Sequence, residues 1–340
     1  MKVGILTFHM AHNCGAMLQA YALSKIINHR YNVYCEIIDY RTPQIYNKYE
    51  NEMKEYNCDN RRAFFEDFLN HTLTKSKRIY SIDEANEYDI FIIGSDQVWN
   101  QKILKDNDEI YFAEFTNNKY CISYASSTGQ SLSNPQRFSR RLEKFQRISV
   151  RECFLQTQLQ PYFHKQIQLC VDPVLLFDSV FWSQEFLLDT KPSNNYSLIY
   201  SFKLTWDLYL KIQNDSFCNG INTVELFTHK RNFERVDYLV DCYGPKEWIN
   251  YFKNAKCVYT DSYHGILFSL LFNKPFYCTN NSTENERISD FIKHFQLYKN
   301  KDGFYIKSRF TNKLLEKERK NSLSFLDNAF YQVFNDDTKL

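Results

Sequence analysis

Short runs of hydrophobic residues alternate with helically spaced ones along the first part of the chain. Residues 3–8 and 33–40 have the apolar character of buried strands, and between them Leu18, Ala22 and Ile26 recur at four-residue spacing, which predicts a helix. A strand, a helix and a second strand within about forty residues form a βαβ unit, in which the two strands are parallel. We therefore expect a parallel sheet with crossover helices.

The same pattern continues to about residue 178. Further strands are predicted at residues 88–93, 119–124, 148–150 and 168–171, and helices at 63–72 and 134–145. Residues 46–62 are polar with little periodicity and indicate a surface excursion. The loop after the first strand carries Asn13 and Gly15 but no GxGxxG motif, so a nicotinamide cofactor is not expected.

A second α/β unit follows a weakly patterned bridge at residues 179–195. Its strands are predicted at 196–202, 223–228 and 257–259, and its helices at 206–213, 245–254, 286–295 and 311–330. Because 340 residues are too many for one small core, we expect two α/β domains, residues 1–178 and 179–312, with a cleft between them. For the helical end, residues 313–340, a solvated face and packing back onto the first domain both remain open.

The most informative stretch is the corner TDSYHG, residues 260–265, between a strand and an apolar helix that runs to about residue 273. Thr260, Asp261 and Ser262 are residue types that cap a helix start, and His264 falls in the first turn. The backbone N–H groups and the helix dipole suit an anion such as phosphate there. A plain capping corner with a hydrogen-bonded histidine explains the same residues.

A second polar corner, GSDQVWN at residues 94–100, ends the strand at 88–93. Ser95, Asp96, Gln97 and Asn100 place a hydroxyl, a carboxylate and amides at the carboxyl end of a strand, where ligands bind in open α/β sheets. The alternative is an Asx-type turn with Trp99 in the core.

Two further strand ends carry candidate groups. The loop ASSTG, residues 125–129, consists of small residues that would let a ligand approach closely. Arg151 follows the short strand at 148–150, and its guanidinium could bind a carboxylate or phosphate or pair with Glu152 as plain structure.

Composition and charge exclude several classes of protein. A hydrophobic content of 44%, with 25 Tyr and 29 Phe against 8 Gly and 7 Pro, is typical of a folded globular protein. A net charge of +2 argues against duplex nucleic acid as a partner. The ten cysteines show no CxxC or zinc-type spacing, so no metal is expected. Together with the lack of a signal peptide or a long apolar run, they indicate a soluble cytoplasmic protein.

Six motifs, taken together and in order, resemble the polysaccharide pyruvyl transferase family: KVGILTFH…NCGAMLQAYAL, YDIFIIGSDQVWN, SYASSTG, ISVRE, VDPVLL and VYTDSYHGILFSLLFNKPF. The resemblance covers most of the chain and implies two Rossmann-like domains in a glycosyltransferase-B (GT-B) arrangement. It also implies transfer of the carboxyethylidene group of phosphoenolpyruvate to a sugar as a cyclic ketal, with release of phosphate. The implied acceptor is a cell-surface glycan or its lipid-linked precursor, and the latter would bring the protein to the inner face of the membrane.

The resemblance also implies roles for individual residues. His264 would contact the donor phosphate and act as general acid, Arg151 would clamp the carboxylate or phosphate, and Asp96 would be a base or a ligand of the acceptor hydroxyl. Phosphoenolpyruvate is then a substrate, and no other cofactor is implied. The remaining candidate binding residues are Thr260, Ser262, Gly265, Asn13, Gly15, Ser95 and Gln97.

One position departs from the family pattern. Some relatives carry an arginine where this chain has Ser262, so Lys256, Arg287 or another basic residue must compensate, or backbone N–H groups and hydroxyls must hold the donor. An inverting nucleotide-sugar glycosyltransferase on the same fold and a glycan-binding module without chemistry are the competing functions. Trp99 and Tyr263 are each able to stack on a sugar or to lie in the core.

Overall fold

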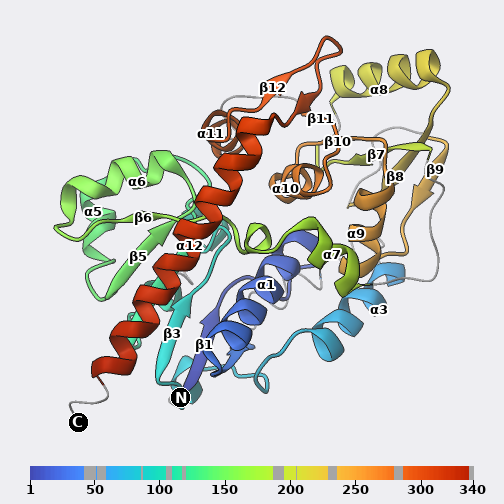
Figure 1. Cartoon of the computed structure of the whole chain (residues 1–340). Coiled ribbons are helices and arrows are strands. Elements are labelled where there is room, and N and C mark those ends of the chain that lie inside the picture. The colour runs from blue at the N-terminus through green and yellow to red at the C-terminus, as the bar shows by residue number, and fades with distance from the viewer. Residues whose placement is uncertain are drawn as a thin grey trace.

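The computed structural model describes residues 1–41, 51, 59–85, 87–104, 109–116, 120–186, 195–203, 205–228, 236–278 and 286–336. Two sheets dominate it (Figure 1). The first has the strand order β2-β1-β3-β4-β5-β6, and all its described pairs are parallel. Its strands are β1 Lys2–Leu6, β2 Tyr34–Ile37, β3 Ile90–Ile93, β4 Tyr120–Ser126, β5 Arg147–Val150 and β6 Gln168–Leu169.

Helices join these strands. They are α1 Cys14–Tyr31, α3 Asp59–Asp67, which continues as a π-helical turn at Phe68–Thr72, α4 Gln101–Leu104, α5 Pro135–Arg140, α6 Cys153–Leu159 and the short 3-10 helix η5 Pro173–Leu176. The helix predicted at residues 134–145 is shorter than expected, because turns replace it after Arg140. Most of the predicted excursion at residues 46–62 lies outside the described residues.

The second sheet has the order β12-β13-β11-β10-β7-β8-β9. Its strands are β7 Tyr196–Tyr200, β8 Asn222–Leu226, β9 Tyr238–Val240, β10 Cys257–Thr260, β11 Phe276–Tyr277, β12 Tyr298–Lys299 and β13 Tyr305–Ile306. Strand β13 pairs antiparallel with β11 and with β12, and the other described pairs of this sheet are parallel. Its helices are α7 Ser179–Glu185, α8 Trp206–Asn219, α9 Pro245–Asn254, α10 Tyr263–Leu271, α11 Glu286–His294 and α12 Arg309–Asp336.

The bridge expected at residues 179–195 begins as a helix, α7. Asp178 caps it by accepting a hydrogen bond from the Phe181 backbone N–H, and Trp182 is fully buried against Phe268, with 5.2 Å between ring centroids. Trp182 is the only fully buried side chain of α7, so the sequence shows no helical period there.

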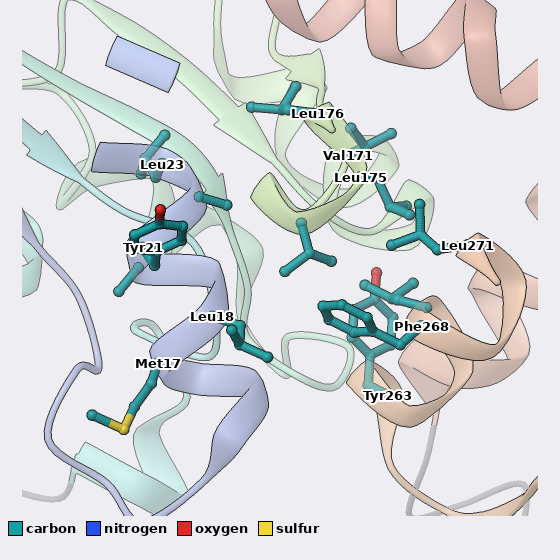
Figure 2. Close-up of a cluster of buried hydrophobic side chains, with 14 of the residues drawn as sticks. Met17, Leu18, Tyr21, Leu23, Val171, Leu175, Leu176, Tyr263, Phe268 and Leu271 are labelled. Carbon is teal, nitrogen blue, oxygen red and sulfur yellow. The ribbon is translucent and has the colours of Figure 1, made fainter. Parts of the chain in front are cut away.

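A single apolar core connects the two sheets. It includes Leu18 of α1, Leu175 of η5 and Phe268 of α10, which Figure 2 shows facing one another from three separate elements. The segment η5 packs against both α1 and α10. Because these contacts are apolar and continuous, they hold the carboxyl ends of the two sheets in a defined relation.

Helix α12 packs on the first half of the chain. Figure 1 shows it in red, leaving the second sheet beside α11 and running along the first. The Ser322 hydroxyl accepts a hydrogen bond from the Val171 backbone N–H at 2.9 Å, and Arg30 forms a two-pronged ion pair with Asp327. The rings of Tyr31 and Phe330 stack with 4.1 Å between centroids. Of the two alternatives left open by the sequence, the structure therefore shows α12 packed against the first domain.

We expect apolar packing, not the ion pair, to hold α12 in place. Phe330→Ala should lower the free energy of unfolding by about 3–5 kcal/mol because Phe330 is buried. Asp327→Ala should cost less than about 1 kcal/mol, since both charged side chains of the pair remain some 40% exposed. Urea unfolding of the two variants tests this, and a cost for Asp327→Ala equal to that of Phe330→Ala would contradict it.

Candidate functional site

The corner TDSYHG joins β10 to α10 and is held by its own side chains. The Ser262 hydroxyl caps α10 by accepting a hydrogen bond from the Gly265 backbone N–H at 3.2 Å, and the Thr260 hydroxyl accepts one from the Ser262 N–H at 3.0 Å. Asp261 does not cap the helix; its carboxylate accepts hydrogen bonds from the backbone N–H groups of Phe202 and Lys203. The capping explanation is therefore correct for Thr260 and Ser262.

Close packing around the corner also explains Gly265. A Cβ atom at this position would lie 2.4 Å from the Thr260 hydroxyl oxygen, so only glycine leaves room for the turn. Both hydroxyls, from Thr260 and Ser262, are directed at the backbone of their own corner. A ligand at this helix start would therefore have to displace or share these hydrogen bonds.

His264 is buried between the two halves of the chain. Its imidazole Nε2 lies 3.3 Å from Asp172 Oδ2, which is within ion-pair distance. The two groups do not form a hydrogen bond, and Nε2 has no hydrogen-bond partner among the described residues. Gly15 of α1 packs on the ring, since a Cβ atom there would lie 2.3 Å from Cγ and Nδ1. Asn13 caps α1 by accepting hydrogen bonds from the Gly15 and Ala16 N–H groups. Asn13 and Gly15 thus place α1 against the imidazole.

Asp172 is the centre of the site, although sequence reasoning did not select it. It follows β6, caps η5 through the Val174 N–H, and is fully buried. Its Oδ2 accepts a 2.7 Å hydrogen bond from Arg151 Nη1 and lies 3.5 Å from the Ser95 hydroxyl. Burial alone would raise the pKa of Asp172, but the charges of His264 and Arg151 outweigh it and lower the pKa to about 2. The available signal was an Asp-Pro pair directly after a predicted strand.

Other groups of the protein contact most of the Arg151 guanidinium. Its side chain is fully buried, its guanidinium lies 4.4 Å from the centre of the Tyr263 ring, and its Nε donates to Glu152 Oε1 at 3.3 Å. Pairing with Glu152, the structural alternative, is thus observed. Only Nη2 lacks a hydrogen-bond partner; it lies 3.7 Å from Asp96 Oδ1. A ligand would therefore find an unused hydrogen-bond donor on this arginine at Nη2.

Glu152 completes the buried charge cluster. Its Oε1 accepts a 2.6 Å hydrogen bond from the Ser127 hydroxyl, while Oε2 has no partner. Burial raises the pKa of this carboxyl, and the charge of Arg151 only partly opposes that shift. The ASSTG loop, to which Ser127 belongs, therefore contacts the site through Glu152.

The side chains of the GSDQVWN corner point in different directions, some toward the charge cluster and some into the core. The Asp96 backbone is left-handed, with φ of 71°, and its carboxylate lies near Arg151; Ser95 lies near Asp172. Gln97 turns the other way, accepts a hydrogen bond from the Asn100 side chain and packs against Gly129. Trp99 is buried, with its indole N–H donating to the Tyr111 carbonyl, so it belongs to the core.

Arg287 stands near the place of the missing arginine. It is the second residue of α11, and its guanidinium lies 5.4 Å from the centre of the Tyr263 ring, on which Arg151 also packs. Burial and the charge of Arg151 lower the pKa of Arg287 from its usual high value. Lys256 is exposed before β10, at the opposite end of that strand from the corner. Tyr263 is buried under the two arginines and so is not placed as a sugar platform.

The site therefore combines one histidine, three carboxylates and two arginines at the carboxyl ends of both sheets. Three buried polar atoms in it have no hydrogen-bond partner, namely Arg151 Nη2, His264 Nε2 and Glu152 Oε2. Such atoms are costly unless a ligand or a change of state satisfies them. Over the described ranges no group of three or more His, Cys, Asp or Glu side chains is arranged to hold a metal ion, and no helix within them is long and apolar enough to span a membrane.

Gly15→Ala should displace the imidazole of His264, because the added methyl group would overlap the ring. We expect a loss of about 1–3 kcal/mol in the free energy of unfolding and a shift of the His264 NMR resonances. Gly220→Ala is the control: it meets no neighbour but strains a left-handed helix end, at a cost of about 1–2 kcal/mol. Unchanged His264 resonances in Gly15→Ala would refute the contact.

Asp172 should stabilise the fold in a pH-dependent way. Because its pKa of about 2 lies below the ordinary 3.8, its contribution is present above about pH 4 and is lost as the pH falls towards 2. The difference in unfolding free energy between wild type and Asp172→Asn should therefore shrink by about 2 kcal/mol from about pH 5 to pH 2. Urea unfolding across this range measures it, with the exposed Asp207→Asn as control. A constant difference would contradict this assignment.

Solved structures similar to this chain share its fold at low sequence identity. UDP-GlcNAc 2-epimerase from Methanocaldococcus jannaschii, in complex with UDP-GlcNAc and UDP, gives a TM-score of 0.52 at 13% identity, covering 85% of this chain and 86% of that one. The Neisseria meningitidis enzyme bound to UDP-GlcNAc gives 0.53 at 11% identity, covering 97% and 93%. UDP-N-acetylglucosamine 2-epimerase from Rickettsia bellii gives 0.51 at 10% identity, covering 96% and 97%.

These matches show the fold alone, a GT-B arrangement of two α/β units whose sheets are wholly or mainly parallel, and they confirm the expected fold class. No curated protein matches the chain significantly. The family model for polysaccharide pyruvyl transferase matches residues 13–283, which include both polar corners, Arg151, Asp172 and His264. The chain belongs to the polysaccharide pyruvyl transferase family.

Proposed function

We propose that the protein transfers the carboxyethylidene group of phosphoenolpyruvate to two hydroxyls of one sugar, forming a cyclic ketal and releasing phosphate. The observation that carries this proposal is a histidine–aspartate contact close to two arginines. His264 faces the buried carboxylate of Asp172, and the neighbouring Tyr263 ring is contacted by both Arg151 and Arg287. The family membership supports the same reaction class.

The proposed chemistry needs a proton donor. The methylene carbon of phosphoenolpyruvate takes up a proton, one sugar hydroxyl bonds to the neighbouring carbon, and a second hydroxyl displaces phosphate. One hydroxyl proton balances the new methyl group and the other leaves with phosphate. His264 is the proposed donor, and its Nε2 lies 3.3 Å from the Asp172 carboxylate, which would hold the imidazole in place.

The proposed anion contacts come from the arginines and from the start of α10. Arg287 is half-buried and lies next to the cluster, so it is better placed than Lys256 to supply the second positive charge. Arg151 would contribute through Nη2, whose hydrogen-bonding capacity is unused. Asp96, whose side chain keeps 10% exposure beside Nη2, is the proposed contact for an acceptor hydroxyl.

The acceptor in this proposal is a sugar of a cell-surface polysaccharide or of its lipid-linked precursor. A lipid-linked acceptor would require contact with the inner membrane surface from the cytoplasmic side. A nucleotide sugar is the competing donor, because the fold is shared with enzymes solved with UDP-GlcNAc. The two donors differ in the groups they present, so binding experiments separate them.

Phosphoenolpyruvate should raise the apparent thermal stability of the protein, by roughly 3 kcal/mol at a hundredfold excess over its dissociation constant. UDP-GlcNAc should leave it unchanged. Differential scanning fluorimetry measures both. Stabilisation by UDP-GlcNAc alone would refute the proposed donor.

His264→Gln should lower phosphate release from phosphoenolpyruvate, assayed with a panel of sugar acceptors, by about a hundredfold or more, because a general acid is removed. His29→Gln, an exposed histidine at the end of α1, is the matched control and should retain wild-type turnover. Equal turnover of the two variants would remove His264 from the acid role.

A further inference from the structure

Helix α11 belongs to the second half of the chain, but three of its side chains attach it to the first half (Figure 1). Glu286 accepts hydrogen bonds from the Ser131 backbone N–H, at 2.7 Å, and from the Ser131 hydroxyl. Asp290 Oδ2 accepts one from the Cys153 backbone N–H at 2.8 Å, and His294 Nδ1 lies 3.3 Å from Cys153 Sγ. The three side chains follow one another at four-residue spacing, so they share one face of the helix.

The hydrogen bond from Cys153 to Asp290 satisfies the start of α6. Cys153 is the first residue of α6, and the first N–H groups of a helix have no partner within the helix. Glu152, which precedes it, makes no side-chain cap, because its carboxylate accepts hydrogen bonds from Ser127 and Arg151 instead. A carboxylate from the other half of the chain therefore takes the place of a local cap.

Both ends of this hydrogen bond lie close in sequence to an arginine of the charge cluster. Arg151 is two residues before Cys153, and Arg287 is three residues before Asp290, on the same side of α11. The two guanidiniums lie 4.4 Å and 5.4 Å from the centre of the Tyr263 ring. The hydrogen bond thus connects the two segments that bring both arginines to one ring.

Two like charges at one ring repel each other. Burial and the charge of Arg151 lower the pKa of Arg287, so α11 meets the first domain against an electrostatic cost. The hydrogen bond of Asp290 is partly buried, whereas those of Glu286 are exposed to water and screened by salt. Asp290 therefore offsets the repulsion more effectively than Glu286 does.

We propose that Asp290 is a positioning residue for the donor site, because its hydrogen bond to the Cys153 N–H holds α11, and with it Arg287, against the segment that carries Arg151. Asp290 acts through Arg287 rather than on the donor. This assignment rests on the proposed function, because it treats the two arginines as ligands of phosphoenolpyruvate. When the hydrogen bond is removed, repulsion between the guanidiniums moves α11 outward and weakens donor binding.

Isothermal titration of the full chain with phosphoenolpyruvate measures this role without a sugar acceptor. Asp290→Ala should raise the dissociation constant about tenfold or more, as for the loss of one charge-assisted contact. Asp290→Asn keeps an acceptor oxygen for the Cys153 N–H and should stay within about threefold of wild type. Asp302→Ala, which removes an exposed carboxylate from the same half of the chain, is the control and should bind like wild type.

A double-mutant cycle separates positioning from general destabilisation. Because Asp290 acts through Arg287, Asp290→Ala should weaken binding no further in an Arg287→Ala background. An equal loss of affinity with and without Arg287 would overturn the assignment.

A second variant removes the hydrogen bond from the other side. Cys153→Pro deletes the N–H, and proline is tolerated as the first residue of a helix. Glu152 before it is already extended, with φ of −108° and ψ of 140°, as a residue before proline must be. Cys153→Pro should weaken phosphoenolpyruvate binding in the same direction as Asp290→Ala, and it provides the test should Asp290→Ala not fold.

The wild-type result tests the proposed reaction separately. Binding by wild type with unchanged affinity in Asp290→Ala and Cys153→Pro overturns the positioning role and leaves the proposed function intact. Absence of binding by wild type counts against the proposed donor, and a crystal structure of Asp290→Ala then decides the positioning role. Displacement of Arg287 from the Tyr263 ring supports that role, and an unmoved Arg287 overturns it.

Discussion

The structure of the candidate site depends on one buried carboxylate that a guanidinium and an imidazole share. Asp172 receives the Arg151 guanidinium at 2.7 Å and faces the His264 imidazole at 3.3 Å, with no exposed surface of its own. An isolated buried charge is too costly to persist, so the three groups require one another. Since Arg151 and Asp172 belong to the first half of the chain and His264 to the second, this interaction also holds the two sheets in relation.

The apolar core supplies the rigidity that this arrangement needs. Helix α1 presents Leu18 toward η5 and α10, and at its start Gly15 lies directly on the His264 ring. The short η5 segment begins at Asp172 and ends in the core between α1 and α10. Displacing any of these elements would change the distance from the imidazole to the carboxylate, so packing and chemistry are coupled here.

The buried state of the site has a consequence for substrate entry. Arg151 has no exposed surface and His264 very little, yet three of the polar atoms around them lack partners. An arrangement of this kind is satisfied when a ligand supplies the missing partners and excludes water. The contact from Ser131 to Glu286 joins the loop after β4 to α11, and so links the first sheet's domain to the second.

The sequence alone determined the succession of strands and helices, the two polar corners and the family. Hydrophobic periodicity and residue order along the chain are local properties, and they carried the prediction of two parallel α/β units. Periodicity failed at α7, where Trp182 alone is buried. Tertiary structure decided which polar residues meet. Thr260, Ser262 and Gln97 form hydrogen bonds within their own turns. Asp172 and Arg287, by contrast, contact His264 and Tyr263 in the site. The contact between Asp172 and His264 joins residues more than ninety positions apart, and no local pattern encodes such a distance.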